Sequence, residues 1–132
     1  MTDTDDIVAV QQAVAAFNHC VDFGDGETFG GLFTEDGVLD MGHLRIEGRP
    51  ALRDFAVGVK DRVANPRHIV SNTWVDVTGD TATARSYAQV YATLDGVTTV
   101  LKTTGRYEDK LVRTGEGWRF YERRFVVDSA AP

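Results

Sequence analysis

The sequence has little cysteine and no long apolar run, and each absence excludes a class of protein. The one cysteine, Cys20, cannot close an internal disulfide, which is typical of a chain in a reducing compartment. No apolar run approaches the roughly 20 residues that a membrane-spanning helix needs. The N-terminus is rich in aspartate, where a secretory signal would be basic and then apolar. We therefore expect a cytoplasmic protein.

Basic charge is also scarce, because 14 Lys and Arg stand against 20 Asp and Glu and leave a net charge of −6. Without a basic cluster, the chain lacks the phosphate-binding surface of nucleic-acid proteins and any attraction to anionic membranes. Its 42% hydrophobic and 26% charged residues are those of a globular protein, and 132 residues suffice for one core. We expect a single domain over 1–132 that binds neither nucleic acid nor membrane.

Three segments show the periodicity of helices. Apolar residues recur at three- and four-residue spacing from Ile7 to Val21 and predict a first helix that ends near Gly24. Asp25 is placed to cap a short second helix. Pro50 is placed to begin a third helix, which we expect to end before Pro66.

From residue 67 onward the sequence is rich in Val, Thr, Tyr and Ile and predicts long strands. The runs 67–78, 81–94 and 97–112 are separated by Gly-Asp and Asp-Gly pairs, which are strong hairpin signals, and a last strand is expected over 118–127. Short strands at 38–41 and 44–46 follow a turn predicted at 34–37. The expected fold class is α+β, with a curved antiparallel sheet wrapped around the N-terminal helices. A curled sheet that is covered by a helix encloses a cavity.

The common cofactor and metal motifs are missing. The Gly-Asp-Gly at 24–26 lacks the third glycine of a dinucleotide fingerprint and follows a predicted helix, and there is no P-loop. The three histidines, His19, His43 and His68, lack the spacing of metal ligands, and the single cysteine disfavours zinc. We therefore expect neither a cofactor nor a metal.

Two residues are candidates for proton-transfer chemistry. His68 opens the first long strand, and the alternation of side chains places Val70, Asn72 and Trp74 on its face. An imidazole exchanges protons near neutral pH, which makes His68 the natural base. Asp22 lies on the flank of the first predicted helix, close to its end, where a carboxylate can be half-buried. The alternatives are a histidine at the core edge with an ordinary hydrogen bond, and a solvated aspartate at a helix end.

Arg123 lies on the last predicted strand, on the same face as Tyr121. An arginine among apolar and aromatic neighbours needs either a carboxylate partner or an anionic ligand, and both remain open. Tyr87, Tyr91 and Tyr107 alternate along other predicted strands. Each of these tyrosines can line a cavity or pack, and packing is favoured for any single one.

Several short motifs follow one another along the chain, namely Phe17–Asp25, Leu32–Gly37, Glu47–Arg49, Arg67–Asn72, Gly79–Ala82, Gly105–Asp109 and Gly117–Arg119. In this order and spacing they resemble the SnoaL-like branch of the nuclear-transport-factor-2-like superfamily. The resemblance covers nearly the whole chain, roughly residues 5–128. The resemblance implies an NTF2-like α+β cone, whose curved, antiparallel or mixed sheet wraps around the N-terminal helices and encloses a pocket.

The superfamily includes scytalone dehydratase, bile-acid 7α-dehydratase and hexachlorocyclohexane dehydrochlorinase. These enzymes pair an aspartate at the end of the first helix with a histidine at the start of the first long strand, and Asp22 and His68 match these positions. The resemblance implies that His68 removes a proton from the substrate while Asp22 holds its tautomer and stabilises the imidazolium. Arg123 matches a pocket arginine of the dehydrochlorinase, which implies a role in stabilising negative charge.

The sequence departs from these enzymes at two places. The second histidine of the fungal dehydratase has no counterpart on the middle strand 81–94, which offers Tyr87, Gln89 and Tyr91 instead. The helix tyrosine of the bile-acid enzyme is Phe17 in this chain. Both changes remove proton donors to a leaving group. Elimination started by a base therefore fits better than acid-assisted loss of water, unless a tyrosine substitutes.

The expected function is that of a small cofactor-independent enzyme that abstracts a proton from an apolar cyclic substrate. Elimination of the dehydratase or lyase type is the leading hypothesis, followed by isomerisation or cyclisation. The candidates for substrate binding are Phe17, Asn72, Trp74, Tyr87, Tyr91 and Tyr121. The alternative is a non-catalytic ligand-binding or assembly module, like the β-subunits of ring-hydroxylating dioxygenases. The expected partners are a small apolar or polycyclic ligand and, by resemblance, further copies of the chain in a homodimer or homotrimer.

Overall fold

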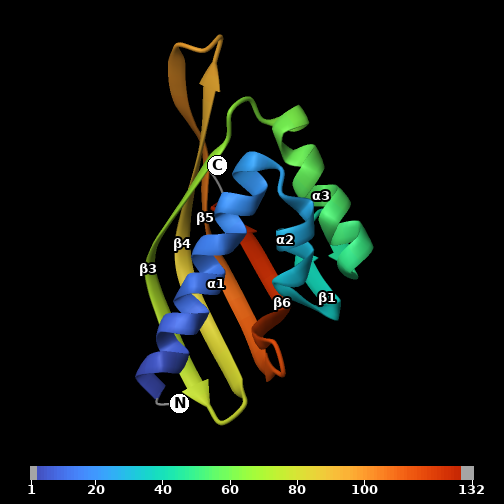
Figure 1. Cartoon of the computed structure of the whole chain (residues 1–132). Helices are drawn as coiled ribbons and strands as arrows, with labels where there is room; N and C mark the ends of the chain where they lie inside the picture. Colours follow the sequence, from blue (N-terminus) through green and yellow to red (C-terminus); the bar gives the residue numbers. More distant parts are fainter. Residues whose placement is uncertain (1–2, 129–132) are drawn as a thin grey trace.

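Three helices and six strands make up residues 3–128, which are the residues that the computed structural model describes (Figure 1). In chain order the elements are α1 (Asp3–Phe23), α2 (Gly26–Gly31), β1 (Phe33–Asp40), β2 (Arg45–Glu47), α3 (Arg49–Arg62), β3 (Arg67–Thr78), β4 (Thr81–Leu94), β5 (Thr98–Thr114) and β6 (Gly117–Val127). The domain expected over 1–132 also includes residues 1–2 and 129–132, which lie outside the described residues.

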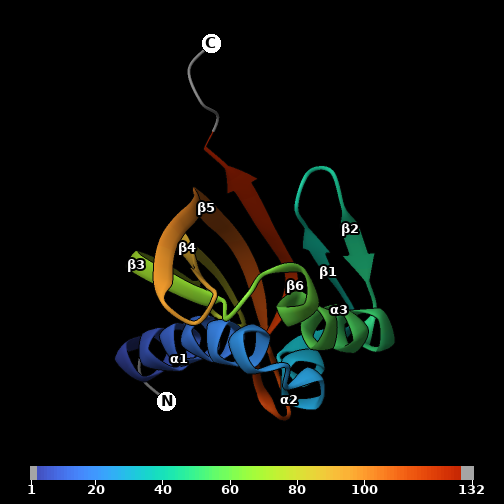
Figure 2. The same cartoon turned by 90° about the horizontal axis from the view of Figure 1, so that it is seen from above.

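The strands form one mixed sheet in the order β2-β1-β6-β5-β4-β3. Neighbouring strands are antiparallel except β1 and β6, which pair in parallel. The sheet is curved but not closed, and the helices lie against its concave side (Figures 1 and 2). The expected α+β cone with a curved sheet around N-terminal helices is therefore confirmed.

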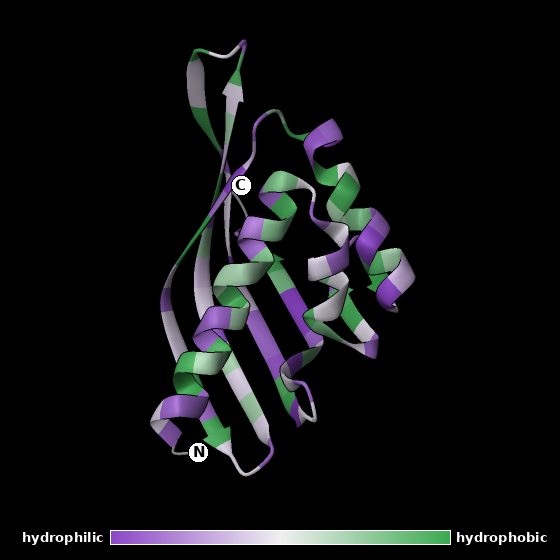
Figure 3. Ribbon diagram, viewed as in Figure 1, coloured by the Kyte–Doolittle hydropathy of each residue, from purple (hydrophilic) through white to green (hydrophobic). Residues whose placement is uncertain are grey.

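Helix α1 packs on the sheet through the apolar stripe that the sequence predicted. Val10, Val14, Phe17 and Val21 are buried, and hydrophobic and hydrophilic bands alternate along the helix (Figure 3). Each such side chain stabilises the fold by about 1.5–3 kcal/mol when it is fully buried. The inner face of β4 carries small, buried residues. These residues are Ala82, Ala84, Ser86 and Ala88.

A buried carboxylate, that of Asp6, connects the start of α1 to strands β5 and β6. Asp6 accepts hydrogen bonds from Nη1 and Nη2 of Arg113 on β5, at 2.8 and 3.0 Å, and from Nε1 of Trp118 on β6, at 3.1 Å. The hydrogen bonds from Arg113 and Trp118 hold the pKa of Asp6 below its usual value. This anchor fixes one end of α1, while the other end brings Asp22 to the start of β3.

The turn predicted at 34–37 is wrong, because these residues belong to β1. The β1–β6 register shifts between Phe33 and Val38, so the chain forms a bulge within the strand. At Gly37 a Cβ atom would lie 2.8 Å from the Cβ of Phe33, which leaves room only for glycine. The turn-like sequence therefore marks an irregular strand.

Most other predicted boundaries agree with the structure. Helix α1 ends at Phe23, and the carboxylate of Asp25 caps α2 by accepting from the Thr28 N–H at 3.1 Å. The β4–β5 hairpin turns through Asp95 and Gly96, which both have positive φ, as a tight hairpin requires. Within residues 3–128, no helix is long and apolar enough to cross a membrane.

Candidate active site

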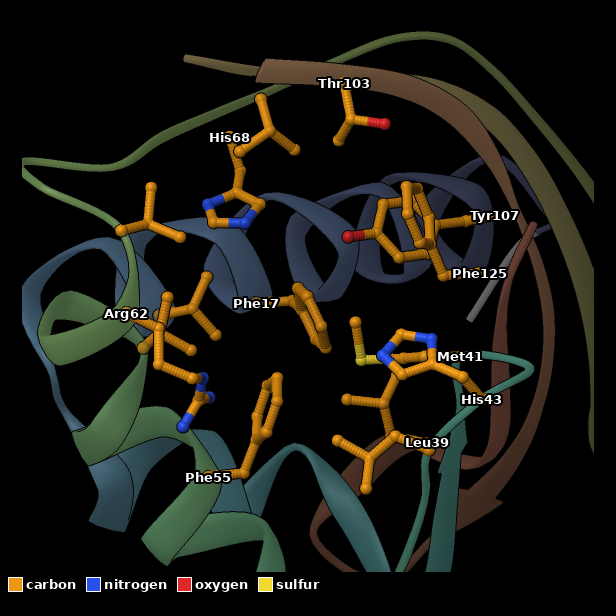
Figure 4. A pocket seen from close by; sticks show the side chains of 15 residues that line it. Phe17, Leu39, Met41, His43, Phe55, Arg62, His68, Thr103, Tyr107 and Phe125 are labelled. Atoms are coloured by element: carbon orange, nitrogen blue, oxygen red, sulfur yellow. The ribbon is translucent and has the colours of Figure 1, made fainter. Parts of the chain in front are cut away.

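A cavity of about 220 Å³ lies between α1, α3, the β1–β2 turn and the concave face of the sheet (Figure 4). Most of its wall is apolar. The apolar part is formed by Phe17, Val21, Leu39, Met41, Leu44, Phe55, Val59, Val63, Val90 and Phe125. Five lining residues carry a polar group on the side chain, namely His43, Arg62, His68, Thr103 and Tyr107. An apolar cavity with a few polar groups is the usual form of a small-molecule site.

The imidazole of His68 contacts Asp22 at the cavity wall. Nδ1 of His68 lies 2.6 Å from Oδ1 of Asp22, and the backbone N–H of His68 donates to both carboxylate oxygens at 3.2 Å. Their side chains are only 14% and 8% exposed, so water screens this contact weakly. The ring of His68 projects into the cavity (Figure 4). The two residues that the sequence proposed as a dyad are thus in direct contact.

The end of α1 and the start of β3 bring these two residues together. Helix α1 ends at Phe23, one residue after Asp22, and β3 begins at Arg67, one residue before His68. The guanidinium of Arg67 lies 4.9 Å from the ring centroid of Phe23 and packs the two ends against each other. The contact is therefore built from two rigid elements rather than from loops.

Arg123 lies behind the cavity wall rather than in it. Its side chain is fully buried, and Nε donates to Oδ1 of Asp109 at 3.0 Å. The guanidinium carbon lies 3.6 Å from the ring centroid of Tyr107 and 4.2 Å from that of Phe17, and both of these rings line the cavity. Of the two possibilities left open by the sequence, a carboxylate partner is the one present. Arg123 does not contact the cavity directly.

Burial strongly shifts the pKa of Asp109, the carboxylate that pairs with Arg123. Desolvation raises the pKa of Asp109 to about 6, although the charge and hydrogen bond of Arg123 act in the opposite direction. Burial likewise raises the pKa of Tyr107 to about 12, and the charge of Arg123 offsets part of that rise. Tyr107 is therefore a neutral phenol at any physiological pH.

Two predicted substrate-binding residues on β3 lie outside the cavity, which corrects the prediction. The β3–β4 register shifts between Ser71 and Trp74, and Asn72 has a φ of 55°. This bulge reverses the alternation of side chains along the strand. His68 faces the cavity, whereas Trp74 is 63% exposed and, with Asn72, Arg85 and Tyr87, lines a separate groove.

Three tyrosines that were predicted to bind the substrate also lie outside the cavity. Tyr87 and Tyr91 alternate with inward-facing alanines on β4, so both point away from the cavity, and Tyr87 is 60% exposed. Tyr121 is the extra residue of a bulge in β6, since Lys110 pairs with Glu122 and the next residue of β5 pairs with residue 120. Tyr121 is 41% exposed and does not share a face with Arg123. Phe17 is the one substrate-binding candidate that lines the cavity.

Four polar lining residues were not among the predicted site residues. Tyr107 was favoured as a packing residue, but its hydroxyl group points into the cavity (Figure 4). The sequence contains a signal for this placement. Tyr107 pairs with Ser86, and the small side chains on β4 mark the inner face of the sheet, which Tyr107 shares. His43 in the β1–β2 turn and Arg62 at the end of α3 are exposed residues at the rim, and Thr103 lies on β5. No sequence pattern indicated these last three.

The helices on a curved mixed sheet, with the cavity between them, define an NTF2-like fold, also described as cystatin-like. The model of the SnoaL-like domain family matches residues 2–124, and the chain belongs to this family. No curated protein matches the sequence.

Three solved structures illustrate the similarity. A variant of Rv3472, a protein of unknown function from Mycobacterium tuberculosis, has a TM-score of 0.89 and 32% identity over 97% of this chain and 75% of that chain. An NTF2-like protein from Novosphingobium aromaticivorans has a TM-score of 0.89 and 26% identity, covering 97% of this chain and 85% of that one. Aln2 from a Streptomyces species has a TM-score of 0.82 and 27% identity, covering 92% and 89%.

Proposed function

We propose that this protein is a cofactor-independent enzyme that removes a proton from carbon in a small apolar cyclic substrate. The observation that carries the proposal is the 2.6 Å contact between His68 and Asp22 at the wall of an apolar cavity. Elimination, as in a dehydratase or another lyase, is the favoured reaction. Isomerisation or cyclisation would use the same first step.

The geometry supports a division of roles between the two residues. Because a carboxylate can only accept, the 2.6 Å contact with Asp22 favours the tautomer of His68 with its proton on Nδ1, and Nε2 then has the lone pair that a general base needs. When Nε2 takes a proton, the imidazolium is stabilised by the adjacent carboxylate. Low exposure strengthens that interaction, because fewer water molecules compete for the charges.

The size and lining of the cavity support a small ligand. A volume of about 220 Å³ is below the usual 300–1,000 Å³ of drug-binding pockets and suits a compound of one or two rings. Phe17, Phe55 and Phe125 offer aromatic surface for such rings. Exposed polar residues at the rim, His43 and Arg62, are available to a polar substituent at the mouth.

The non-catalytic alternative accounts less well for these features. A purely structural module gains most from a filled interior, since close packing stabilises a core. Here the large side chains of Trp74 and Tyr121 lie on the outer face and leave the interior open. The oriented histidine favours an enzyme over a passive binding module.

The proposal is tested with 5-nitrobenzisoxazole, a bicyclic probe that reports removal of a proton by a base. The base takes the C3 proton, the C–H electron pair forms the nitrile, and the N–O bond breaks to give a coloured phenolate. We expect His68→Gln to lower kcat/KM about 100-fold. The control is His19→Gln, an exposed histidine on α1 that does not line the cavity. Equal rates for the His68 and His19 variants, or a wild-type rate equal to that of buffer, would contradict the proposal.

A further inference from the structure

The hydroxyl group of Tyr107 points into the cavity without a hydrogen-bond partner among residues 3–128. The residue is 5% exposed, it lines the cavity, and its oxygen is directed toward the interior, on the side where His68 lies (Figure 4). A buried tyrosine hydroxyl normally has a hydrogen-bond partner, because its desolvation is costly without one. Because the hydroxyl group faces the cavity and is not bonded to another of the described residues, it is available to donate a hydrogen bond to a ligand atom.

A buried cation lies directly against the ring of Tyr107. The guanidinium carbon of Arg123 is 3.6 Å from the ring centroid, and the ion pair with Asp109, at 3.0 Å, holds the guanidinium in place. Neither Nη1 nor Nη2 of Arg123 has a hydrogen-bond partner within the described residues, so the charge is directed at the rings of Tyr107 and Phe17. A cation in this position stabilises negative charge on the phenol oxygen and makes the hydroxyl a stronger hydrogen-bond donor.

We propose that Tyr107 is a catalytic hydrogen-bond donor, which stabilises negative charge on a substrate oxygen while His68 removes the proton. Arg123 is a positioning residue that acts through the ring of Tyr107. The inference rests on the proposed function and narrows its substrate class to cyclic compounds with an oxygen leaving group. In the reaction the C–H bond breaks, its electron pair forms the new multiple bond, and the bond to the leaving oxygen breaks. Nε2 of His68 holds the proton, and the departing oxygen accepts the Tyr107 hydrogen bond.

The other polar groups of the cavity are less suited to this role. The hydroxyl of Thr103 donates to the carbonyl of Thr104 at 3.3 Å. His43 and Arg62 are exposed at the rim, where water weakens their interaction with a developing charge. Tyr107 is buried and, with a pKa of about 12, remains protonated throughout the working pH range. Tyr107 can also act as the donor to the leaving group in place of the second histidine, which this sequence lacks.

The first test compares Tyr107→Phe with Tyr87→Phe, which removes an exposed hydroxyl from the outer face. With 5-nitrobenzisoxazole as the probe, Tyr107→Phe is expected to lower kcat about 10- to 100-fold, as the loss of a hydrogen bond to a charged oxygen does. Tyr87→Phe is expected to match the wild type. In a series of ring-substituted benzisoxazoles, the rate in Tyr107→Phe should depend more steeply on the acidity of the leaving phenol. An unchanged rate and slope would overturn the inference.

A second measurement separates this inference from the proposed function. The reaction product, 2-cyano-4-nitrophenolate, is expected to bind about tenfold more weakly to Tyr107→Phe than to the wild type and to Tyr87→Phe. This comparison requires no catalysis by His68. Equal affinities would overturn the role of Tyr107 even if His68 is the base. If the product binds more weakly to Tyr107→Phe but the elimination rate does not depend on His68, only the proposed function is contradicted.

The role of Arg123 is tested by removing the ion pair as a unit with Arg123→Met and Asp109→Asn in one chain. The dependence of the rate on the acidity of the leaving phenol should then become steeper than in the wild type. Should this variant not fold, Arg123→Lys retains the charge but loses the planar contact with the ring, and a smaller change in slope is expected. A slope equal to that of the wild type would overturn the positioning role.

Discussion

The carboxylate of Asp22 contacts His68 at two points, 2.6 Å from Nδ1 and 3.2 Å from the backbone nitrogen. Because one carboxylate binds both the backbone and the ring of the same residue, it restricts the rotation of the imidazole relative to β3. The nitrogen that remains for the cavity is Nε2, for which residues 3–128 provide no hydrogen-bond partner. The orientation of the candidate base is thus fixed before any ligand binds.

This contact predicts the tautomer of neutral His68. Since a carboxylate accepts but does not donate a hydrogen bond, the neutral ring should carry its proton on Nδ1. Two-dimensional ¹⁵N–¹H NMR of the ring nitrogens distinguishes the two tautomers. In Asp22→Asn the preference for Nδ1–H should weaken, because the amide can also donate. A neutral wild-type ring protonated at Nε2 would contradict the assigned roles.

Asp109 is predicted to titrate far from the usual range of a carboxyl group. Its pKa in the folded protein is raised from 3.8 to about 6, chiefly by burial. The folded state therefore binds the proton more tightly than the unfolded chain does. The stability that this group contributes is fully present below pH 3.8 and is lost as the pH rises through about 6. The ¹³C shift of its carboxyl group should show a midpoint near 6, and a midpoint below about 4 would contradict the effect of burial.

The bulge at Asn72 is predicted to tolerate glycine but not a β-branched residue. Its φ of 55° is left-handed, a conformation that glycine adopts freely and valine does not. Asn72→Val should lower the free energy of unfolding by about 1–2 kcal/mol, whereas Asn72→Gly should change it by less than about 1 kcal/mol. Urea unfolding measures both, with Ser71→Val as the matched control on the same strand. Equal stability of Asn72→Val and Ser71→Val would show that the bulge imposes no strain.

Local patterns were sufficient to predict most of the fold. The apolar spacing from Ile7 to Val21 predicted the buried face of α1, and turn dipeptides predicted the hairpins between the long strands. These features depend on residues that are close in sequence. The match of Asp22 and His68 to the family pattern was the only route to their pairing, because 46 residues separate them along the chain.

Side-chain direction on the strands was harder to predict, because a bulge reverses the alternation and leaves little trace in the sequence. Asn72 shifts Trp74 to the outer face, and the bulge at Tyr121 separates that residue from Arg123. The sequence likewise could not distinguish an arginine that lines the cavity from one buried behind an aromatic ring. That distinction depends on Tyr107, which lies on a neighbouring strand.

The measurement that tests the account most directly is a double-mutant cycle of His68→Gln and Asp22→Asn, followed by elimination of 5-nitrobenzisoxazole. If Asp22 acts through His68, each single variant is expected to slow the reaction about 100-fold, and the double variant should be no slower than His68→Gln. Residues that act as one unit show this strong non-additivity. If instead the two effects multiply, or if His68→Gln reacts as fast as the wild type, the proposed dyad is contradicted.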